Sequence, residues 1–305
     1  MLNITLRQLQ IIEAVARHSK VNLAAAELLL TGPAVTLQLK QVEANLSEKL
    51  FDRTNEGLFL TQFGEVVLDT ARTVRTEILN LEEKLNALRG LGMGTLRLGV
   101  VSTGKYFAPM LMAAFCSLHP EIKLKLFVGN RKDTIRRLQN LEVDLVLMGR
   151  PPKNFPVRTQ LFGDHPFVFI SNRTHRLASA LDITKEDIAT EEFIIREQGS
   201  GTRQILEMFL SEIPGRTDNL GAEMDSNETI KQAVIAGLGV ALISGHTIEQ
   251  ELKLKRLVVL DVLGSPIRRQ WFSISRKDRN KTPSMEAFEK FLLREGSKYS
   301  KTLLK

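Results

Sequence analysis

Hydroxyl and amide side chains stand where helices would begin in the last two thirds of the chain. Ser102-Thr103-Gly104-Lys105 follows the apolar run 95–101, Gly199-Ser200-Gly201-Thr202-Arg203 opens one helical pattern, and Ser226-Asn227 opens another. Helix starts offer free N–H groups to anions, although serine and threonine there are also ordinary caps. Each segment alone leaves both interpretations open, but the three together favour an anion-binding site.

Four arginines lie near the predicted strand ends or helix starts: Arg131, Arg150, Arg196 and Arg203. The carboxyl ends of parallel strands border the crevice in which open α/β sheets bind ligands. Guanidinium groups form strong, paired hydrogen bonds with phosphate and carboxylate groups. The sequence therefore predicts a cleft for a ligand that carries a phosphate or a carboxylate.

The segments that must position these residues alternate between strands and helices. Strand patterns at 95–101, 122–128 and 143–148 enclose helix patterns at 107–118 and 133–141. This order predicts a doubly wound parallel sheet. Further strands are expected near 157–163, 166–171, 193–196, 220–224, 239–243, 257–260 and 270–275, and further helices after Ser200, at 226–236 and at 283–295. Two similar α/β halves indicate a two-lobed binding module.

Nothing in the sequence indicates an enzyme. The five histidines, at positions 18, 119, 165, 175 and 246, are scattered and show no spacing typical of metal ligands. There is no G-x-S-x-G elbow and no phosphate-binding P-loop motif. Cys116 stands on an apolar helix between Phe115 and Leu118 and is expected in the core. We therefore expect no catalytic residues, no metal and no cofactor.

The first 46 residues carry the signals of three short helices. Thr5-Leu6-Arg7-Gln8 fits a capping box, Asn22 is expected to cap a helix over 23–30, and Thr31-Gly32-Pro33 starts a third helix that ends near Leu46. The buried face of the third helix is predicted to be Val35, Leu39, Val42 and Leu46, which leaves Ala34, Thr36, Leu37, Lys40 and Gln41 outward. This pattern fits a helix-turn-helix that reads a DNA major groove, but also a plain three-helix packing unit.

A short hairpin is predicted directly after the third helix. Residues 50–54 and 57–61 flank the turn Asn55-Glu56-Gly57. A hairpin in this position is typical of the wing of a DNA-binding domain, and Arg53 is the best candidate to reach a phosphate or the minor groove. The alternative role for Arg53 is an ion pair with Asp52 or Glu56.

Residues 63–89 form one long helical pattern with a narrow apolar seam. The seam steps alternately by four and three residues through Val67, Ala71, Val74, Ile78, Leu81, Leu85 and Leu88. Such a seam is typical of a coiled-coil dimer interface. The alternative is that the helix packs on its own winged domain. We favour dimerisation, which would also supply two recognition helices for a two-fold DNA site.

Size and charge fit a soluble, multidomain protein. The chain has 305 residues, of which 43% are hydrophobic and 25% charged, and this length suggests two or three domains. No apolar run approaches the ~20 residues of a membrane span, and the first residues lack a signal-peptide pattern, so a cytoplasmic location and no membrane contact are expected. The formal charge of +7 lies entirely in residues 264–305, which hold 11 Lys+Arg and 4 Asp+Glu. We interpret this segment as a solvated final helix, and leave open whether it contacts DNA.

The ordered N-terminal segments resemble the winged helix-turn-helix of LysR-type transcriptional regulators. The segments that carry the resemblance are Asn22–Leu30, Thr31–Glu43, Leu50-Phe51-Asp52-Arg53 and Leu60-Thr61-Gln62-Phe63-Gly64. The resemblance covers essentially the whole chain and implies an α/β protein with an N-terminal winged helix-turn-helix, a linker helix and a two-lobed effector domain like periplasmic binding proteins. The implied boundaries are 1–62 for the DNA-binding domain, 63–90 for the linker, 91–94 for a hinge, 95–163 plus 268–305 for lobe I, and 164–267 for lobe II.

The resemblance also assigns residues to DNA and implies a dimer or tetramer. The DNA-contacting residues that it implies are Thr31, Pro33, Ala34, Thr36, Leu37 and Lys40 in the groove region and Arg53 in the wing. One position departs from the family pattern, because the family usually has a polar residue before the recognition-helix proline and this chain has Gly32. We therefore transfer no base contact to that position.

Several effector-domain segments resemble the branch that regulates RuBisCO and Calvin-cycle operons. They include 102–109, 128–131, 148–152, 196–203 and 226–233. The resemblance and the arginine cluster together assign the effector to Ser102, Thr103, Lys105, Asn130, Arg131, Arg150, Arg196, Ser200, Thr202, Arg203 and Asn227. The branch implies an activator of carbon-fixation genes that responds to a phosphorylated metabolite or NADPH, with RNA polymerase as a possible partner.

Two alternatives stay open at this point. The first is a LysR-type regulator of another pathway with a carboxylate effector. The second is a solute-binding protein or enzyme on the same scaffold, whose N-terminal helices serve only assembly. The absence of a signal-peptide pattern and of a catalytic constellation argues against the second alternative.

Overall fold

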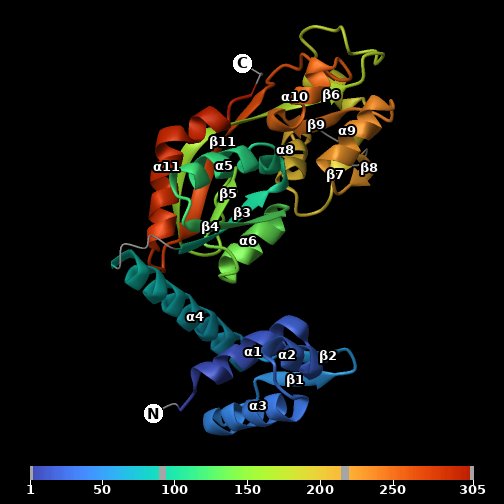
Figure 1. Cartoon of the computed structure of the whole chain (residues 1–305). Coiled ribbons are helices and arrows are strands. Elements are labelled where there is room, and N and C mark those ends of the chain that lie inside the picture. Colours follow the sequence, from blue (N-terminus) through green and yellow to red (C-terminus); the bar gives the residue numbers. More distant parts are fainter. Residues whose placement is uncertain (1–2, 89–93, 214–219, 303–305) are drawn as a thin grey trace. The chain divides into compact units, whose positions relative to one another are not determined.

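The computed structural model describes residues 3–88, 94–213 and 220–302. The chain divides into two compact units, Met1–Glu82 and Glu83–Lys305 (Figure 1). The predicted hinge at 91–94 falls mostly outside the described residues, and the domain boundaries given above stay predictions. No helix in the described part of the chain is long and apolar enough to cross a membrane.

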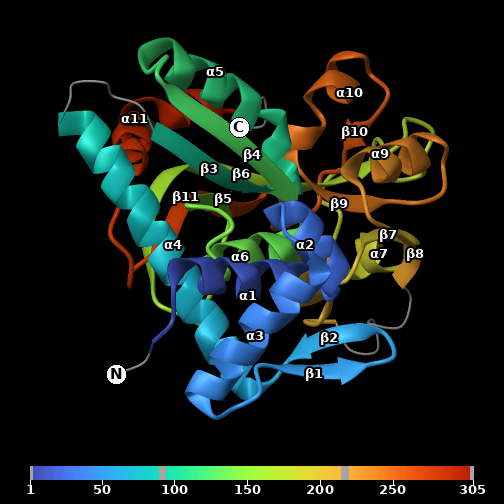
Figure 2. The same cartoon turned by 60° about the horizontal axis from the view of Figure 1, so that its bottom comes forward.

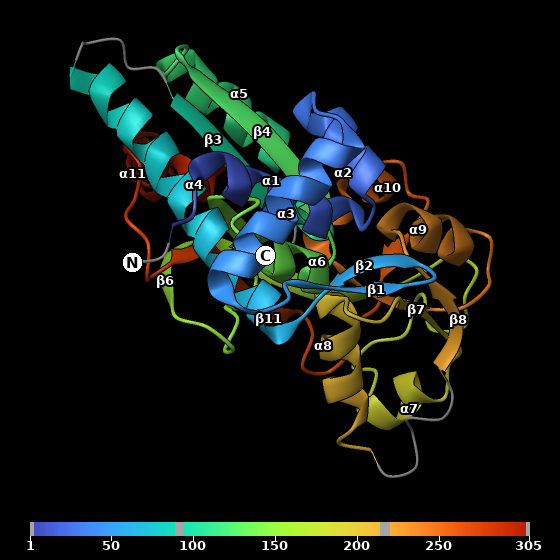
Figure 3. The same cartoon turned by 90° about the horizontal axis from the view of Figure 1, so that it is seen from below.

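The N-terminal unit consists of three short helices, a hairpin and the start of a long helix. The elements are α1 (Leu6–His18), α2 (Val21–Leu28), α3 (Gly32–Leu46), β1 (Phe51–Thr54), β2 (Gly57–Leu60) and α4 (Gln62–Leu88). In this unit the antiparallel hairpin β1–β2 extends away from the three short helices as an arm (Figure 3). The predicted order of helices and hairpin is confirmed.

The helix starts of this unit follow local side-chain chemistry, with one exception. The capping box at Thr5 and Gln8 forms as predicted, and the Thr31 hydroxyl accepts a hydrogen bond from the backbone N–H of Ala34. The prediction for Asn22 is wrong, because α2 begins two residues earlier than predicted, at Val21, and Lys20 occupies its N-cap position without a side-chain cap. The amide oxygen of Asn22 instead lies close to Gly32, where a Cβ would stand 2.9 Å from it.

One apolar core holds the N-terminal unit together. Val35 and Val42 of α3 are fully buried and Leu39 is nearly so, as the spacing predicts, and they pack with residues of α1 and α2. An ion pair between Glu13 and Arg75, with 2.8 Å between Oε2 and Nε, ties α1 to α4. Because Glu13 is buried, this pair fixes the middle of α4 against the helical core.

The C-terminal unit alternates strands with helices. Its elements are β3 (Gly94–Val101), the 3₁₀ helix η1 (Ser102–Tyr106), α5 (Ala108–Leu118), β4 (Ile122–Gly129), α6 (Arg131–Gln139), β5 (Leu145–Met148), β6 (Val157–Ser171), α7 (Lys185–Ala189), β7 (Phe193–Arg196), α8 (Gly201–Leu210), β8 (Leu220–Met224), α9 (Asn227–Ile235), β9 (Ala241–Ser244), the 3₁₀ helix η2 (Gly245–Thr247), α10 (Glu249–Lys253), β10 (Val258–Val259), β11 (Ile267–Arg276) and α11 (Pro283–Tyr299).

The sheet is only partly the parallel sheet that the sequence predicts. Strands β4, β3 and β5 are parallel neighbours, as are β7 and β8, but β11 is antiparallel to both β5 and β6. The two strands expected at 157–163 and 166–171 are one continuous strand, β6. Asp164-His165-Pro166 has turn-like composition, but β11 pairs with β6 along its length and a bulge at Trp271/Phe272 absorbs the irregularity.

Two separate cores divide the C-terminal unit into lobes. Lobe I is built around β3, β4, β5, α5, α6 and α11, with Trp271 and Phe115 in its core. Lobe II is built around β7, β9, α8 and α9, with Phe193 and Ile194 in its cores. In lobe I, α5 and α11 cover one face of the sheet and α6 the other (Figure 2). Strands β6 and β11 contribute to both lobes.

Candidate functional site

The outward face of α3 has the exposure that a groove-reading surface needs. Thr31, Pro33, Thr36, Leu37 and Lys40 are exposed, and Ala34 is half-buried. This orientation follows from the buried residues at 35, 39 and 42 on the opposite face. Two of the hydroxyls already serve the helix, since Thr31 caps it and Thr36 donates to the backbone oxygen of Gly32 over 3.0 Å. Leu37 is 55% exposed, and Lys40 is exposed as well.

The two cations assigned to DNA have no protein partner among the described residues. Arg53 is exposed on β1, and within the described residues neither it nor Lys40 forms an ion pair or side-chain hydrogen bond. The alternative pairing of Arg53 with Asp52 or Glu56 is therefore not formed. An exposed, unpaired cation is suited to a phosphate contact, which positions a protein on DNA without reading the sequence.

Gly32, the position that departs from the family pattern, lies in the turn between α2 and α3. A side chain at this position would begin 2.9 Å from the amide oxygen of Asn22. That oxygen is the end of a flexible side chain, so Asn22 could move to make room for a longer residue before Pro33. Glycine itself has no side chain that could reach a base.

The apolar seam of α4 has two different halves. Val67 packs against the core of the N-terminal unit and Ala71 is 1% exposed. The second half is solvent-exposed: Ile78 37%, Leu81 56%, Leu85 42% and Leu88 86%. The first half packs on the winged unit, as the alternative interpretation states. The second half is exposed, and its pairing with another subunit stays a prediction.

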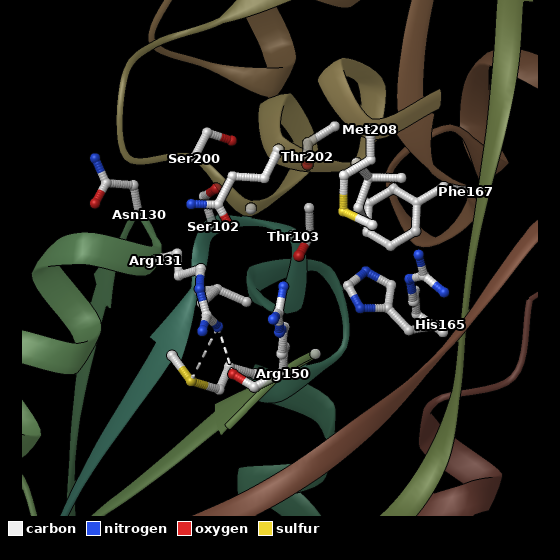
Figure 4. Close-up of a pocket in the computed structure, with 17 residues that line it drawn as sticks. Ser102, Thr103, Asn130, Arg131, Arg150, His165, Phe167, Ser200, Thr202 and Met208 are labelled. Atoms are coloured by element: carbon white, nitrogen blue, oxygen red, sulfur yellow. Dashed lines mark hydrogen bonds between the residues drawn. The ribbon is translucent and has the colours of Figure 1, made fainter. Parts of the chain in front are cut away.

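A cavity of about 370 Å³ lies in the C-terminal unit between the lobes. Seven of the predicted effector residues line it: Ser102, Thr103, Asn130, Arg131, Arg150, Ser200 and Thr202 (Figure 4). They meet there because the carboxyl ends of β3, β4 and β5 and the start of α8 converge at one place. In Figure 4, Arg131 and Arg150 lie across the cavity from Ser200 and Thr202.

The described residues provide no counter-charge on the cationic side of this cavity. Arg131 donates hydrogen bonds to the backbone oxygens of Arg150 and Pro151, and it contacts no carboxylate in residues 3–88, 94–213 and 220–302. Burial and the neighbouring Arg150 charge both lower the pKa of Arg131. Arg150 is exposed and forms no side-chain hydrogen bond or ion pair in the part of the chain that the structure describes. Two adjacent guanidinium groups without an anion are an arrangement that a bound phosphate or carboxylate would stabilise.

Polar side chains of the cavity remain available for a ligand, because helix capping does not occupy all of their hydrogen-bonding groups. Ser200 precedes α8, but its side chain does not cap that helix, and Ser200 and Thr202 are 3% and 5% exposed. Asn130 does cap α6, since its side-chain oxygen accepts from the N–H of Asp133 over 2.9 Å. The amide nitrogen of Asn130 is thus the atom that remains for a ligand. The cavity consequently offers hydrogen-bond donors opposite its two arginines.

The other end of the cavity was not predicted from the sequence. It is lined by His165, Phe167, Ile205, Met208 and Arg269, together with Met148. The His165 ring is 3% exposed and stacks on Trp271 with 3.8 Å between ring centroids. Burial and the nearby His246 hold the pKa of His165 well below its usual range, so its imidazole is neutral, and Arg269 is the charged residue of this wall. These residues lie on β5, β6, β11 and the later turns of α8, away from the helix starts that carried the sequence signal.

Four predicted effector residues do not line the cavity. Arg203 pairs with Glu207 and Glu223, and Lys105 lies over the Tyr106 ring at 5.2 Å. Arg196 is 2% exposed and bonds Glu197 and Asn227. The charge of each arginine is therefore neutralised within lobe II. The Arg203–Glu207 pairing is visible in the sequence as an i, i+4 spacing, whereas the burial of Arg196 depends on the tertiary structure.

Two protein-family models match this chain, one at the N-terminal helices and hairpin and one at the two-lobed unit. Residues 6–65 match the bacterial regulatory helix-turn-helix protein model of the lysR family, and residues 89–297 match the LysR substrate binding domain. The chain belongs to the LysR family. This LysR-family chain is accordingly a DNA-binding transcriptional regulator and not an enzyme, and the resemblance stated from its sequence is confirmed.

Relatives of this LysR-family protein carry related names. It is 56% identical over 299 residues to the "HTH-type transcriptional regulator CbbR" of Rhizobium meliloti, covering 98% of this chain and 96% of that protein. It is 44% identical to the "RuBisCO operon transcriptional regulator" of Allochromatium vinosum, covering 97% and 98%. The solved CcmR regulatory domain of Synechocystis in complex with 2-PG is 34% identical, with a TM-score of 0.63, covering 66% of this chain and 97% of that one.

Proposed function

We propose that this LysR-family protein acts in the cytoplasm as an activator of carbon-fixation genes under the control of a small phosphorylated metabolite. The observation that carries the effector assignment is the pair Arg131 and Arg150, which face a hydroxyl-lined cavity and have no carboxylate partner. The gene assignment is supported by the relatives named for CbbR and the RuBisCO operon. The phosphorylated ligand is supported by the 2-PG complex of the related regulatory domain.

The proposal assigns DNA binding to α3 and the β1–β2 hairpin. Leu37 and Ala34 would contact base edges in the major groove, while Lys40 and Arg53 would contact phosphates. The exposed second half of the α4 seam, from Ile78 to Leu88, would pair with a second subunit and bring two recognition helices to one site. Dimers would associate further into a tetramer that contacts RNA polymerase.

The proposal places a small effector in the cavity in preference to a dinucleotide. Ligand pockets range from about 300 to 1,000 Å³, and this one, at about 370 Å³, is near the lower limit. A phosphate and a short carbon chain fit that space better than NADPH does. A carboxylate effector and a different pathway form the second candidate, because the same arginines bind carboxylates equally well.

The effector would act by favouring one arrangement of the lobes. A ligand shifts a conformational equilibrium only as far as it binds one state more tightly than the other. Donors from both lobes surround the cavity, with Arg131 and Ser102 from lobe I and Ser200 and Thr202 from lobe II. An anion held by both sets favours the closed arrangement, and the subunits of the assembly would respond to that change.

Fluorescence anisotropy with a labelled RuBisCO-operon promoter from the host tests the proposal. The protein is titrated at one fixed salt concentration, because phosphate contacts make the affinity salt-dependent. We expect selective binding that 2-phosphoglycolate or ribulose 1,5-bisphosphate changes and that NADPH does not. Binding equal to that on scrambled DNA would contradict the promoter assignment. Selective binding that responds only to non-phosphorylated carboxylates would favour the second candidate.

A further inference from the structure

The 3₁₀ helix η1 is attached to lobe II at both of its ends. It directly follows β3 of lobe I, and its first residue, Ser102, lines the effector cavity. Its last residue, Tyr106, lies outside the cavity lining. Each of these two residues forms a hydrogen bond to a charged side chain of lobe II.

At the cavity end, Arg196 holds Ser102. The guanidinium donates from Nη2 to the Ser102 hydroxyl oxygen over 3.3 Å and from Nη1 to Asn227 over 2.7 Å, and it forms a two-point ion pair with Glu197. An arginine can only donate hydrogen bonds, so the Ser102 oxygen is the acceptor. The hydroxyl hydrogen of Ser102 therefore remains available for an acceptor oxygen in the cavity. Arg196, which the sequence assigned to the ligand itself, positions a cavity residue instead.

At the far end, Tyr106 joins a charge network on α9 and α10. Its hydroxyl donates to Oε1 of Glu228, whose other oxygen lies 3.0 Å from the ammonium group of Lys231. That ammonium is 3% exposed and also bonds Glu251 over 2.8 Å and the backbone oxygen of Thr247 over 2.9 Å. It lies 5.2 Å from the centre of the Tyr106 ring. Burial and the Glu228 carboxylate raise the pKa of Tyr106, so its hydroxyl stays a donor at neutral pH.

We infer that η1 is an inter-lobe clamp that presents Ser102 and Thr103 to the effector, with Arg196 and the Glu228–Lys231 pair as positioning residues. The identity of the effector in this inference rests on the proposed function. All of the clamp's partners belong to β7, α9, α10 or their flanking turns, so a change in the lobe arrangement must move η1 or break these contacts. The contacts hold the ligand-free protein in the arrangement that binds anions. Without these contacts, only a fraction of the molecules would be in the arrangement that binds the effector. The apparent affinity would then equal the intrinsic affinity multiplied by that fraction.

The test uses Tyr106→Phe in the full-length protein, with 2-phosphoglycolate as the probe in isothermal titration calorimetry. This change removes the bond to Glu228 and keeps the ring beside Lys231. We expect the affinity to fall about tenfold, the effect of losing one hydrogen bond to a charged group. Tyr299→Phe is the matched control, because it removes the hydroxyl of the only other tyrosine, which packs in lobe I. It is expected to leave the affinity unchanged.

A double-mutant cycle separates positioning from general weakening. If the clamp acts through η1, Tyr106→Phe should weaken binding less than twofold in a Ser102→Ala background, where the contact that it positions is already lost. In an Arg131→Ala background, where the lost contact belongs to α6, the tenfold effect should persist. An equal effect of Tyr106→Phe in both backgrounds would overturn the inference.

A ligand-free measurement keeps this test independent of the proposed function. Spin labels at Lys123→Cys in lobe I and Glu186→Cys in lobe II, in a Cys116→Ser background, report the distance between the lobes. We expect a broader or shifted distance distribution in Tyr106→Phe and in Arg196→Met than in the parent or in Tyr299→Phe. A protein that binds no phosphoester but shows this shift would refute the proposed effector and retain the clamp. An unchanged distribution in both clamp variants overturns the clamp, whatever the ligand result.

Discussion

The DNA-binding face of α3 and the effector cavity are assembled in different ways. All but one of the residues assigned to DNA lie at positions 31–40, whereas the cavity collects residues from six segments between Val101 and Arg269. On α3, one amphipathic helix decides which side chains point outward. A residue lines the cavity only if the pairing order of the sheet places its strand end or helix start at the cavity. Sequence reasoning is therefore much more accurate for the first region than for the second.

The cations of the two regions also have different surroundings. Lys40 and Arg53 are exposed, so water already solvates them and a single phosphate contact adds little free energy. Arg131 is half-buried beside a second guanidinium, so an anion there removes a repulsion as well as forming hydrogen bonds. This difference predicts a larger effect of single substitutions in the cavity than on α3.

The largest expected effect is the loss of effector binding in the double variant Arg131→Ala, Arg150→Ala. Each hydrogen bond to a charged group contributes about 1.5–3 kcal/mol, so removal of both arginines should weaken 2-phosphoglycolate binding by about 100-fold or more. Calorimetry measures the affinity for the ligand and anisotropy the affinity for DNA. DNA affinity without ligand should stay within about twofold if the two regions are separate sites. If the double variant also lost about 100-fold in DNA affinity, the cavity and the α3 face would not be separate sites.

A smaller effect is expected for the two DNA-facing cations. Lys40→Ala and Arg53→Ala should each weaken promoter binding by up to about fivefold at low salt and reduce the slope of log affinity against log salt by about one. The loss should be similar on scrambled DNA, because phosphate contacts carry no sequence information. Anisotropy across a salt series measures both quantities. A loss confined to the promoter sequence would instead indicate a base contact.

A pH effect is expected in the C-terminal unit alone. Burial lowers the pKa values of His165 and His246 in the folded state, so the unfolded state binds protons first as the pH falls below about 6.5. Stability is therefore complete above that pH and declines below it, by up to about 1.4 kcal/mol per pH unit for each histidine. Urea unfolding at pH 7.5, 6.5 and 5.5 measures the decline. It should be shallower in His246→Gln, and an unchanged slope would contradict the assignment.

The smallest expected effect sharpens the distinction between cavity and surrounding arginines. Arg203→Ala should change 2-phosphoglycolate affinity by less than about twofold, because Arg203 pairs with Glu207 and Glu223 and does not line the cavity. Arg131→Ala is the matched comparison, with a loss of at least tenfold expected. A large loss in Arg203→Ala would return this residue to the effector site.

Much of the fold could be predicted from local patterns. The capping box at Thr5, the cap at Thr31 and the buried spacing of Val35, Leu39 and Val42 all appear as expected. Seven cavity residues were also found, because hydroxyls and arginines at strand ends and helix starts are a local signal. The antiparallel direction of β11 and the continuity of β6 were missed, because each depends on a partner strand about a hundred residues away.

The sequence by itself determined the family and the recognition helix, and it predicts an anion site between two lobes. These follow from capping, periodicity and residue type, which act between neighbours in the chain. The tertiary structure alone decided which arginines line the cavity. Arg131 and Arg150 reach it without a carboxylate partner among the described residues, while Arg196 is buried against Glu197 and Asn227 and Arg203 pairs with Glu207 and Glu223. The physical reason is that the sequence shows where an arginine lies in its strand or helix, whereas its burial and its access to the cavity depend on packing between segments that are distant in the chain.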